Sequence, residues 1–213
     1  MEIKINNSCP YPMRDSSFTE DSIWRHSADF SSPQRYLVKA PSGTGKTSLI
    51  HFIYGFRPDY EGNILIDNKE SKNISLSEWA AIRQRKFSVI LQDMRLLPTL
   101  TLAENLKVKN KLTNHKTETQ MKTMMECLGM GHKWNQLAGT LSIGQQQRVS
   151  IVRALLQPFE MVLMDEPFSH IDSKNIELAS NLIQNECKAN GAGFILFSLG
   201  DHYEFAYDKI YKL

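Results

Sequence analysis

The feature that most constrains this chain is a glycine-rich turn, Ala40-Pro41-Ser42-Gly43-Thr44-Gly45-Lys46-Thr47, which lies between two apolar segments. The run before it, Tyr36–Val38, predicts a strand, and residues 48–53 after it predict the first turns of a helix. The spacing is that of the phosphate-binding motif G-x-x-x-x-G-K-S/T, with Ala40 in place of the first glycine. An ordinary turn before a helix is the alternative interpretation.

The residue types in this turn suit the binding of a nucleotide through its phosphates. Successive backbone N–H groups and the helix N-terminus form a cradle for anions, and glycines let the backbone approach closely. Lys46 can reach the β- and γ-phosphates, and the Thr47 hydroxyl can join the coordination shell of Mg²⁺. We therefore predict a nucleotide site whose contacts are Ser42, Gly43, Thr44, Gly45, Lys46, Thr47 and Ser48.

Composition argues against several other classes of protein. The 25 Lys and Arg against 23 Asp and Glu leave a net charge of +2, which is too balanced for a nucleic-acid-binding surface. Three scattered cysteines, Cys9, Cys127 and Cys187, give neither a zinc spacing nor a disulfide framework, so we expect a reducing cytosol. No window resembles a signal peptide or a membrane span, so any membrane part is expected on another polypeptide.

Apolar patterning predicts strands that alternate with helices, interrupted by a block of helices. Strands are expected at residues 3–5, 62–67, 87–91, 161–164, 194–197 and 209–213, with edge strands somewhere within 14–35. Helices are expected after the capping box of Ser75 and Glu78, and at 101–108, 117–128, 142–156 and 176–187. Pro10 and Pro12 are expected to exclude regular structure over residues 8–12, and the methionines at 121, 124 and 125 are expected in the core.

A pair of carboxylates, Asp165-Glu166, directly follows the apolar run Met161–Met164. Such a run is typical of a buried parallel strand, and ligands of parallel sheets bind beside the carboxyl ends of the strands. Asp165 could hold Mg²⁺ through water, and Glu166 could polarise a water for in-line attack on a γ-phosphate. A solvated acidic pair is the alternative, but its place after a phosphate-binding turn favours a Walker B motif.

A third segment, Leu141-Ser142-Ile143-Gly144-Gln145-Gln146-Gln147-Arg148-Val149, resembles the L-S-G-G-Q-Q-Q-R-V signature of ATP-binding cassette (ABC) ATPases. Gln92 with its sequel resembles the Q-loop of that family, and residues 169–172 resemble its D-loop. The resemblance covers essentially the whole chain, and it is greatest to the compact LolD-, FtsE- and MacB-like group. Taken alone, the signature could be a Ser-capped helix with a glutamine-rich surface.

This resemblance implies a fold and a division of the chain. The fold is an α/β P-loop NTPase with a parallel, RecA-like core, an antiparallel β edge and an α-helical subdomain. Residues 1–213 would form a single nucleotide-binding domain. Its core would comprise residues 1–92 and 158–213, and residues 93–157 would form the helical subdomain.

The resemblance also implies ATP and Mg²⁺ as ligands, and a head-to-tail pair of cassettes, either as a homodimer or with another cassette. One subunit would bind ATP with its P-loop and Walker B residues, and its partner would contribute Ser142, Gly144 and Gln145. A helix N-terminus capped by Ser142 would then face the γ-phosphate. Tyr11 is the expected aromatic on the adenine ring, with a simple turn residue as the alternative.

Two further roles are carried over in the same way. Gln92 would join Thr47 and Asp165 around the metal ion, and it would take part in catalysis together with Glu166 and Lys46. The Q-loop and the helical block would pass the motion of the cassettes to separate transmembrane permease subunits. The protein would then be cytoplasmic and peripheral on the inner face of the cell membrane.

Three positions depart from the family pattern. Ala40 is a mild change, whereas Ile143 puts a β-branched side chain where the signature has glycine. The family's switch histidine follows the strand predicted at residues 194–197, as in T-H-D, and alignment on Asp201 places Gly200 there. His202 lies two residues later, as a displaced switch or an ordinary surface residue. These changes predict slow or partner-dependent hydrolysis.

Two classes of function therefore stay open. The first is an ATP-hydrolysing subunit that drives a separate membrane permease or mechanotransmission complex. The second is a degenerate or slow cassette that binds ATP to regulate a partner protein. The most informative observation would be which membrane protein co-purifies with this chain from detergent-solubilised cells.

Overall fold

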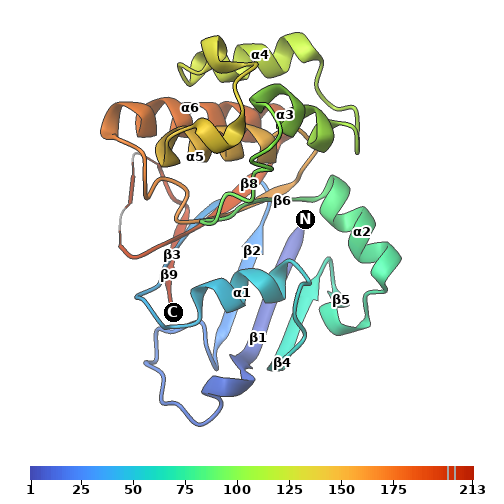
Figure 1. The fold of residues 1–213 in the computed structure, drawn as a ribbon. Coiled ribbons are helices and arrows are strands. Elements are labelled where there is room, and N and C mark those ends of the chain that lie inside the picture. The colour runs from blue at the N-terminus through green and yellow to red at the C-terminus, as the bar shows by residue number, and fades with distance from the viewer. Residues whose placement is uncertain (201, 204) are drawn as a thin grey trace.

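The computed structural model describes residues 1–200, 202–203 and 205–213, and its strands form two sheets (Figure 1). The antiparallel sheet has the order β2-β1-β4-β5, and the parallel sheet has the order β6-β7-β8-β3-β9. The strands of the first are β1 Glu2–Pro10, β2 Ser27–Ser31, β4 Tyr60–Ile66 and β5 Lys69–Glu70. Those of the second are β3 Arg35–Lys39, β6 Phe87–Ile90, β7 Met161–Asp165, β8 Gly193–Ser198 and β9 Lys209–Lys212.

The helices lie on both faces of the parallel sheet. They are α1 Lys46–Ile53, α2 Leu76–Arg85, α3 Leu102–Asn110, α4 Glu118–Cys127, α5 Ile143–Ala154 and α6 Ser173–Asn190. Helices α3, α4, α5 and α6 gather at one end of the molecule, whereas α1 lies near the antiparallel sheet (Figure 1). Residues 93–157, all of them described, contain α3, α4 and α5 but no strand.

Alternation along the parallel strands builds two cores. Successive side chains of a strand point to opposite faces, so neighbouring apolar residues of one strand pack in different clusters. In β7, Val162 and Met164 pack with α5 and α6, whereas Met161 and Leu163 pack with α1 and the antiparallel sheet. Because both faces are covered at the centre of the sheet, β7 and β8 contain the uninterrupted apolar runs 161–164 and 194–197.

Local capping chemistry sets where several helices begin. The predicted capping box of Ser75 and Glu78 is present, since each side chain bonds the backbone N–H of the other residue. The same reciprocal pattern starts α3, α4 and α5. The three methionines of α4 are buried in the core, which confirms their predicted role.

The α/β architecture with an antiparallel edge and a helical block is confirmed. One local prediction was wrong, because residues 8–12 do have regular structure. Strand β1 continues through Pro10, and Tyr11–Met13 forms a short 3₁₀ helix. Proline is tolerated at strand ends and beside bulges, and β1 has an irregular register between Asn6 and Cys9. Within residues 14–35, Ser27–Ser31 is the strand that forms.

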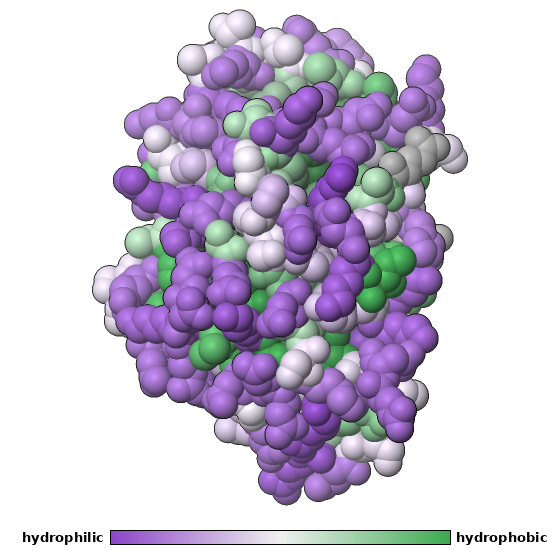
Figure 2. Space-filling model, turned by 180° about the vertical axis from the view of Figure 1, so that it is seen from behind, coloured by the Kyte–Doolittle hydropathy of each residue, from purple (hydrophilic) through white to green (hydrophobic). Residues whose placement is uncertain are grey.

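The surface of the molecule is mostly polar on the face opposite to that of Figure 1. Hydrophilic side chains predominate there, and apolar residues form small separate patches (Figure 2). Among the described residues, none of the helices combines the length and the apolar character needed to cross a bilayer.

Candidate functional site

The glycine-rich turn joins β3 to α1, as the sequence predicts. Gly43 and Gly45 have φ values of 81° and 89°, which favour glycine over other residues. Gly45 is the N-cap of α1, and a Cβ there would lie 3.1 Å from the Trp24 ring. Ala40 fits in place of the first glycine because it is fully buried and continues from β3, with its N–H bonded to Ser198 O at 2.9 Å.

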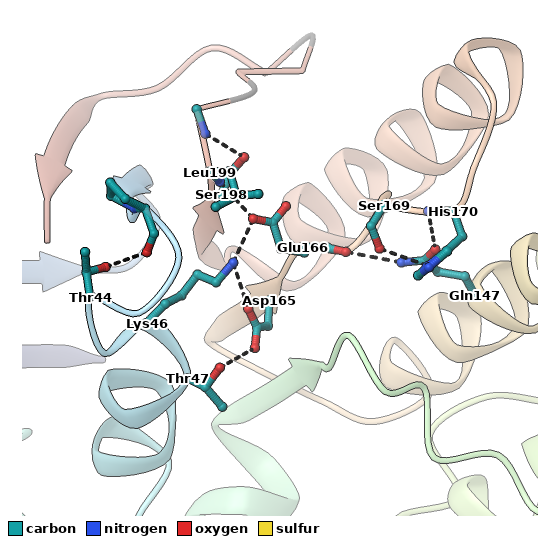
Figure 3. Close-up of polar contacts among 12 residues, drawn as sticks. Thr44, Lys46, Thr47, Gln147, Asp165, Glu166, Ser169, His170, Ser198 and Leu199 are labelled. Carbon is teal, nitrogen blue, oxygen red and sulfur yellow. Dashed lines mark hydrogen bonds and ion pairs between the residues drawn. The ribbon is translucent and has the colours of Figure 1, made fainter.

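Lys46 lies against two carboxylates at the end of β7, those of Asp165 and Glu166. Its Nζ atom is 2.7 Å from Glu166 Oε1 and 3.7 Å from Asp165 Oδ1 (Figure 3). The Thr47 hydroxyl donates to Asp165 Oδ2 at 3.4 Å. The side chains of Lys46 and Glu166 are only 13% and 7% exposed, so water screens this ion pair weakly. Two motifs separated by more than a hundred residues thus form one charged cluster.

A cleft of about 620 Å³ opens beside this cluster. Most of the turn lines it, and Gln92 reaches it from the segment after β6, as expected for a Q-loop residue. Glu166, Ser169, Leu199 and Tyr203 complete its wall, and the turn contributes Pro41, Ser42, Gly43, Gly45, Lys46, Thr47 and Ser48. The predicted contact Thr44 lines a neighbouring cleft, and its hydroxyl donates to Pro41 O at 2.8 Å.

Asp165 has the properties of a cation ligand. It is 3% exposed, and burial raises the pKa of its carboxyl above the ordinary value of 3.8, against the lowering effect of Lys46. Its Oδ1 atom has no hydrogen bond within the described residues. A buried carboxylate oxygen without a hydrogen bond, beside the Thr47 hydroxyl, fits the preference of Mg²⁺ for oxygen ligands.

The backbone around Glu166 is held in an uncommon conformation. Its φ is 44°, in the left-handed region that non-glycine residues rarely adopt. Its N–H donates to Phe197 O at 3.1 Å, and its carbonyl accepts from Gln147 Nε2 at 3.2 Å. Gln147 is fully buried in α5, and its Oε1 accepts from the His170 N–H at 3.0 Å (Figure 3). This single side chain therefore links α5 to both the Walker B and the D-loop segments.

The signature residues lie at the start of α5. Ser142 is the N-cap and forms a capping box with Gln145, and both are at least partly accessible. A Cβ on Gly144 would lie 2.4 Å from His170 O, so this glycine allows the D-loop segment to pack closely. Ser142, Gly144 and Gln145 do not line the cleft of their own chain.

Tyr11 also lies outside that cleft. It begins a 3₁₀ helix, its side chain is exposed, and its N–H donates to Asp59 O. The cleft adjacent to Thr44, of about 350 Å³, is instead walled by Met13, Phe18 and Trp24. Trp24 Nε1 donates to Thr44 O at 2.7 Å, which ties this apolar wall to the turn.

Known proteins carry the same fold and motifs. The family model for ABC transporters matches residues 25–169. The chain belongs to the ABC transporter family. The cell division ATP-binding protein FtsE of Bacillus subtilis is 33% identical over 76% of this chain and 70% of its own length. The lipoprotein-releasing ATP-binding protein LolD of Shewanella oneidensis is 28% identical over 76% of this chain and 72% of its own.

The macrolide export ATP-binding/permease protein MacB of Aggregatibacter actinomycetemcomitans is 31% identical over 83% of this chain, which spans only 28% of that relative. Among solved structures, the dimeric bacterial ABC transporter cassette MJ0796 has a TM-score of 0.77 at 26% identity, covering 93% of this chain and 88% of that one. The same cassette in a post-hydrolysis state with ADP and Pi has a TM-score of 0.75 at 25% identity, with the same coverage. This chain is thus an ABC ATPase cassette.

The predicted switch position, Gly200, depends on an alignment on Asp201, which lies outside the described residues, so it stays a prediction. Strand β8 ends at Ser198, and Leu199 and Gly200 follow it directly. Leu199 lines the cleft, and its N–H donates to Glu166 Oε1 at 2.8 Å. His202 does not line the cleft, and its ring lies 6.3 Å from that of Tyr207.

Sequence reasoning missed several residues at this ABC site. Leu199 and Gln147 contact Glu166, and Tyr203 lines the cleft. The structural role of Gln147 could have been predicted. It is the last of three consecutive glutamines in a predicted helix, and a glutamine that is buried there requires polar partners. The Leu199 contact could not have been predicted, because it is made by the backbone N–H and does not depend on the leucine side chain.

Proposed function

We propose that this chain is the ATP-binding and ATP-hydrolysing subunit of a transporter or mechanotransmission complex, and that it dimerises around ATP to drive a separate membrane subunit. One observation carries the proposal. Lys46, Thr47 and Glu166 line a single cleft, and Asp165 contacts Lys46 and Thr47, while the signature residues lie elsewhere on the same chain. An ATP site made of both sets therefore needs two cassettes.

The roles within one cassette follow from chemistry. The backbone of residues 42–48 would bind the phosphates, and Lys46 would leave its carboxylate partners to contact the β- and γ-phosphates. Mg²⁺, whose chemistry is to neutralise phosphate charge, would be held by Thr47, Asp165 and Gln92. Glu166 would accept a proton from the attacking water.

The apolar cleft beside Thr44 is the proposed place for the adenine ring. Met13 and Phe18 offer flat or polarizable apolar surface, which suits a base that stacks. That Tyr11 contacts the adenine ring stays a prediction from the sequence. Comparing the ATP affinities of Phe18→Ala and Tyr11→Ala distinguishes the two, since only the residue that contacts adenine should weaken binding.

The second half of each ATP site is proposed to come from a partner cassette. Ser142 caps the accessible N-terminus of α5, where the helix dipole favours an anion. With Gly144 and Gln145, it would contact the γ-phosphate bound to the other subunit in a head-to-tail pair. The protein would work in the cytoplasm, peripheral on the inner face of the membrane.

A groove of about 360 Å³ is the proposed docking site for the membrane subunit. Phe56, Leu97, Val108 and Leu112 form exposed apolar parts of its wall, and Lys109 lines it too. Burial and nearby Arg153 lower the pKa of Lys109, and no acidic side chain of the described residues pairs with it. A partner helix with apolar residues and one carboxylate would satisfy both features.

Charge reversal tests this docking. Less membrane subunit should co-purify with the Lys109→Glu variant than with the wild type from detergent-solubilised cells. Lys111→Glu is the matched control, because Lys111 is exposed and does not line the groove. Equal recovery with both variants would place the docking site elsewhere.

Dimerisation tests the proposed function as a whole. Glu166→Gln should keep the phosphate contacts but block water activation, so ATP should trap a dimer visible by size exclusion. Adding Ser142→Arg should abolish that dimer, because it puts bulk and charge at the partner's γ-phosphate. A dimer that responds to neither ATP nor Ser142→Arg would refute the head-to-tail arrangement.

The alternative function, a slow cassette that regulates a partner by its ATP-bound state, rests on two residues. Ile143, where the signature has glycine, and Leu199, which lines the cleft, are 55% and 59% exposed apolar side chains. Neither side chain can donate a hydrogen bond to a phosphate. Tight ATP binding with hydrolysis far below about 1 s⁻¹, even with the membrane subunit present, would favour this alternative.

A further inference from the structure

Glu166 is held at one carboxylate oxygen by a backbone group from the loop after β8. The Leu199 N–H donates to Oε1 at 2.8 Å, and Lys46 Nζ donates to the same oxygen at 2.7 Å (Figure 3). The other oxygen, Oε2, accepts no hydrogen bond from the residues that the structure describes. The carboxylate is therefore fixed at one oxygen and open at the other.

Nucleotide binding changes the balance of these contacts. Phosphate oxygens in the cleft compete with Glu166 for Lys46, because their charge draws the ammonium toward the nucleotide and lengthens its 2.7 Å contact with Glu166 Oε1. Once Lys46 contacts phosphate, the Leu199 N–H is the remaining donor to Oε1. The uncommitted Oε2 can then accept a proton from a water, provided that the carboxylate keeps its orientation.

We propose that the backbone N–H of Leu199 is the positioning group for Glu166 in water activation. The inference rests on the proposed role of Glu166 as the base. Leu199 takes this role through its backbone, because its own side chain is apolar and His202 does not line the cleft. Leu199 acts through Glu166 and need not touch the substrate.

This N–H can be removed without breaking the sheet. The last residue of β8, Ser198, pairs with Lys39, and Ser198 O accepts from the Ala40 N–H. The Leu199 N–H lies beyond this ladder, and Glu166 Oε1 is its acceptor. Leu199 does not have a positive φ, and Ser198 is extended, so the backbone can accept a proline at position 199. The proline Cδ would also displace Glu166 Oε1, which lies 2.8 Å from this nitrogen, so the ester variant below is the one that removes the N–H alone.

The test compares Leu199→Pro, which deletes the N–H, with Leu199→Ala, which keeps it. Leu199→Pro should lower kcat for ATP hydrolysis about tenfold to a hundredfold, while KM and ATP affinity stay within about threefold. The kcat of Leu199→Ala should be at least about tenfold higher than that of Leu199→Pro. A second variant replaces Leu199 by its α-hydroxy acid, which exchanges the N–H for an ester oxygen and should reproduce the loss.

The outcomes separate this inference from the proposed function. Equal losses of kcat in Leu199→Pro and Leu199→Ala would overturn the role of the N–H. Wild-type kcat in both variants that lack the N–H, Leu199→Pro and the α-hydroxy acid variant, would overturn it too. A parallel fall in ATP affinity and melting temperature would show a merely structural contact and would overturn it too. If Glu166→Gln hydrolyses ATP like the wild type, it is the proposed role of Glu166 that fails.

Discussion

At the scale of single residues, Lys46 must exchange partners for this cassette to bind ATP. Its ammonium neutralises two weakly exposed carboxylates, Asp165 and Glu166. Lys46→Ala should therefore cost about 1–3 kcal/mol of unfolding free energy, because it leaves buried charge unpaired. It should also weaken ATP binding about tenfold to a hundredfold, since a charge-assisted phosphate contact is lost.

Calorimetry with ATP and denaturant unfolding measure the two effects separately. Lys39→Ala is a suitable control, because Lys39 is a β3 lysine that does not line the cleft. Unchanged ATP affinity in Lys46→Ala would contradict the assignment of the phosphate-binding turn.

Restoring the switch histidine is a second prediction at this scale. Gly200 has a φ of 153°, so Gly200→His should destabilise the protein by about 1–3 kcal/mol without helping hydrolysis. Leu199→His should instead raise the single-turnover rate about tenfold or more, because it puts a polar side chain beside the cleft. Rapid-quench kinetics and thermal melting check both variants, and acceleration by Gly200→His alone would favour Gly200 as the switch position and contradict this prediction.

At the scale of elements, the sequence predicts what is encoded locally. The capping box of Ser75 and Glu78 and the buried strand before Asp165 follow from neighbouring residues alone. Contacts between distant segments are different. The approach of the His170 carbonyl to Gly144 depends on how α5 packs on the loop after β7, and no short pattern encodes that packing.

The site divides in the same way. The turn and the carboxylate pair were predicted, because phosphate and metal chemistry restrict which residue types can serve. Tyr11 is predicted to contact the adenine ring because it is an aromatic residue before the turn. Its position relative to the turn depends on the path of residues 11–24, which the proline pattern does not predict. The Leu199 contact is made by backbone, so side-chain identity carries no signal of it.

Gln147 connects three of these elements, and its loss should affect stability and activity together. Gln147→Ala should remove about 1–3 kcal/mol of unfolding free energy, because it leaves the Glu166 carbonyl and the His170 N–H without their partner. Hydrolysis should slow as well, since the Glu166 backbone loses one of its contacts. Gln146→Ala is the matched control, whose half-buried amide donates only to Leu141 O. Denaturant unfolding and steady-state hydrolysis measure both, and equal small effects would contradict the bridging role.

At the scale of the whole molecule, the P-loop cleft and the signature residues are on separate parts of one chain, so each proposed ATP site takes one set from each subunit. Subunit mixing tests this directly. Lys46→Ala protein lacks a working P-loop, and Ser142→Arg protein lacks a working signature, so neither can form a working site with copies of itself. In a mixed dimer, the intact P-loop of the Ser142→Arg subunit meets the intact signature of the Lys46→Ala subunit, which restores one site of two.

Two inactive proteins should therefore recover activity when they are mixed. With equal amounts and random pairing, half of the dimers are mixed, so hydrolysis should return to about a quarter of the wild-type rate if the two sites act independently. Mixing Lys46→Ala protein with the Lys46→Ala/Ser142→Arg double variant must stay inactive, since no combination of these subunits contains an intact P-loop. Recovery in the first mixture alone requires a site shared between two copies of this chain. Absence of recovery, with subunit exchange verified by a fluorescent label, would mean that the cassette pairs with a different chain or that each site is complete within one subunit.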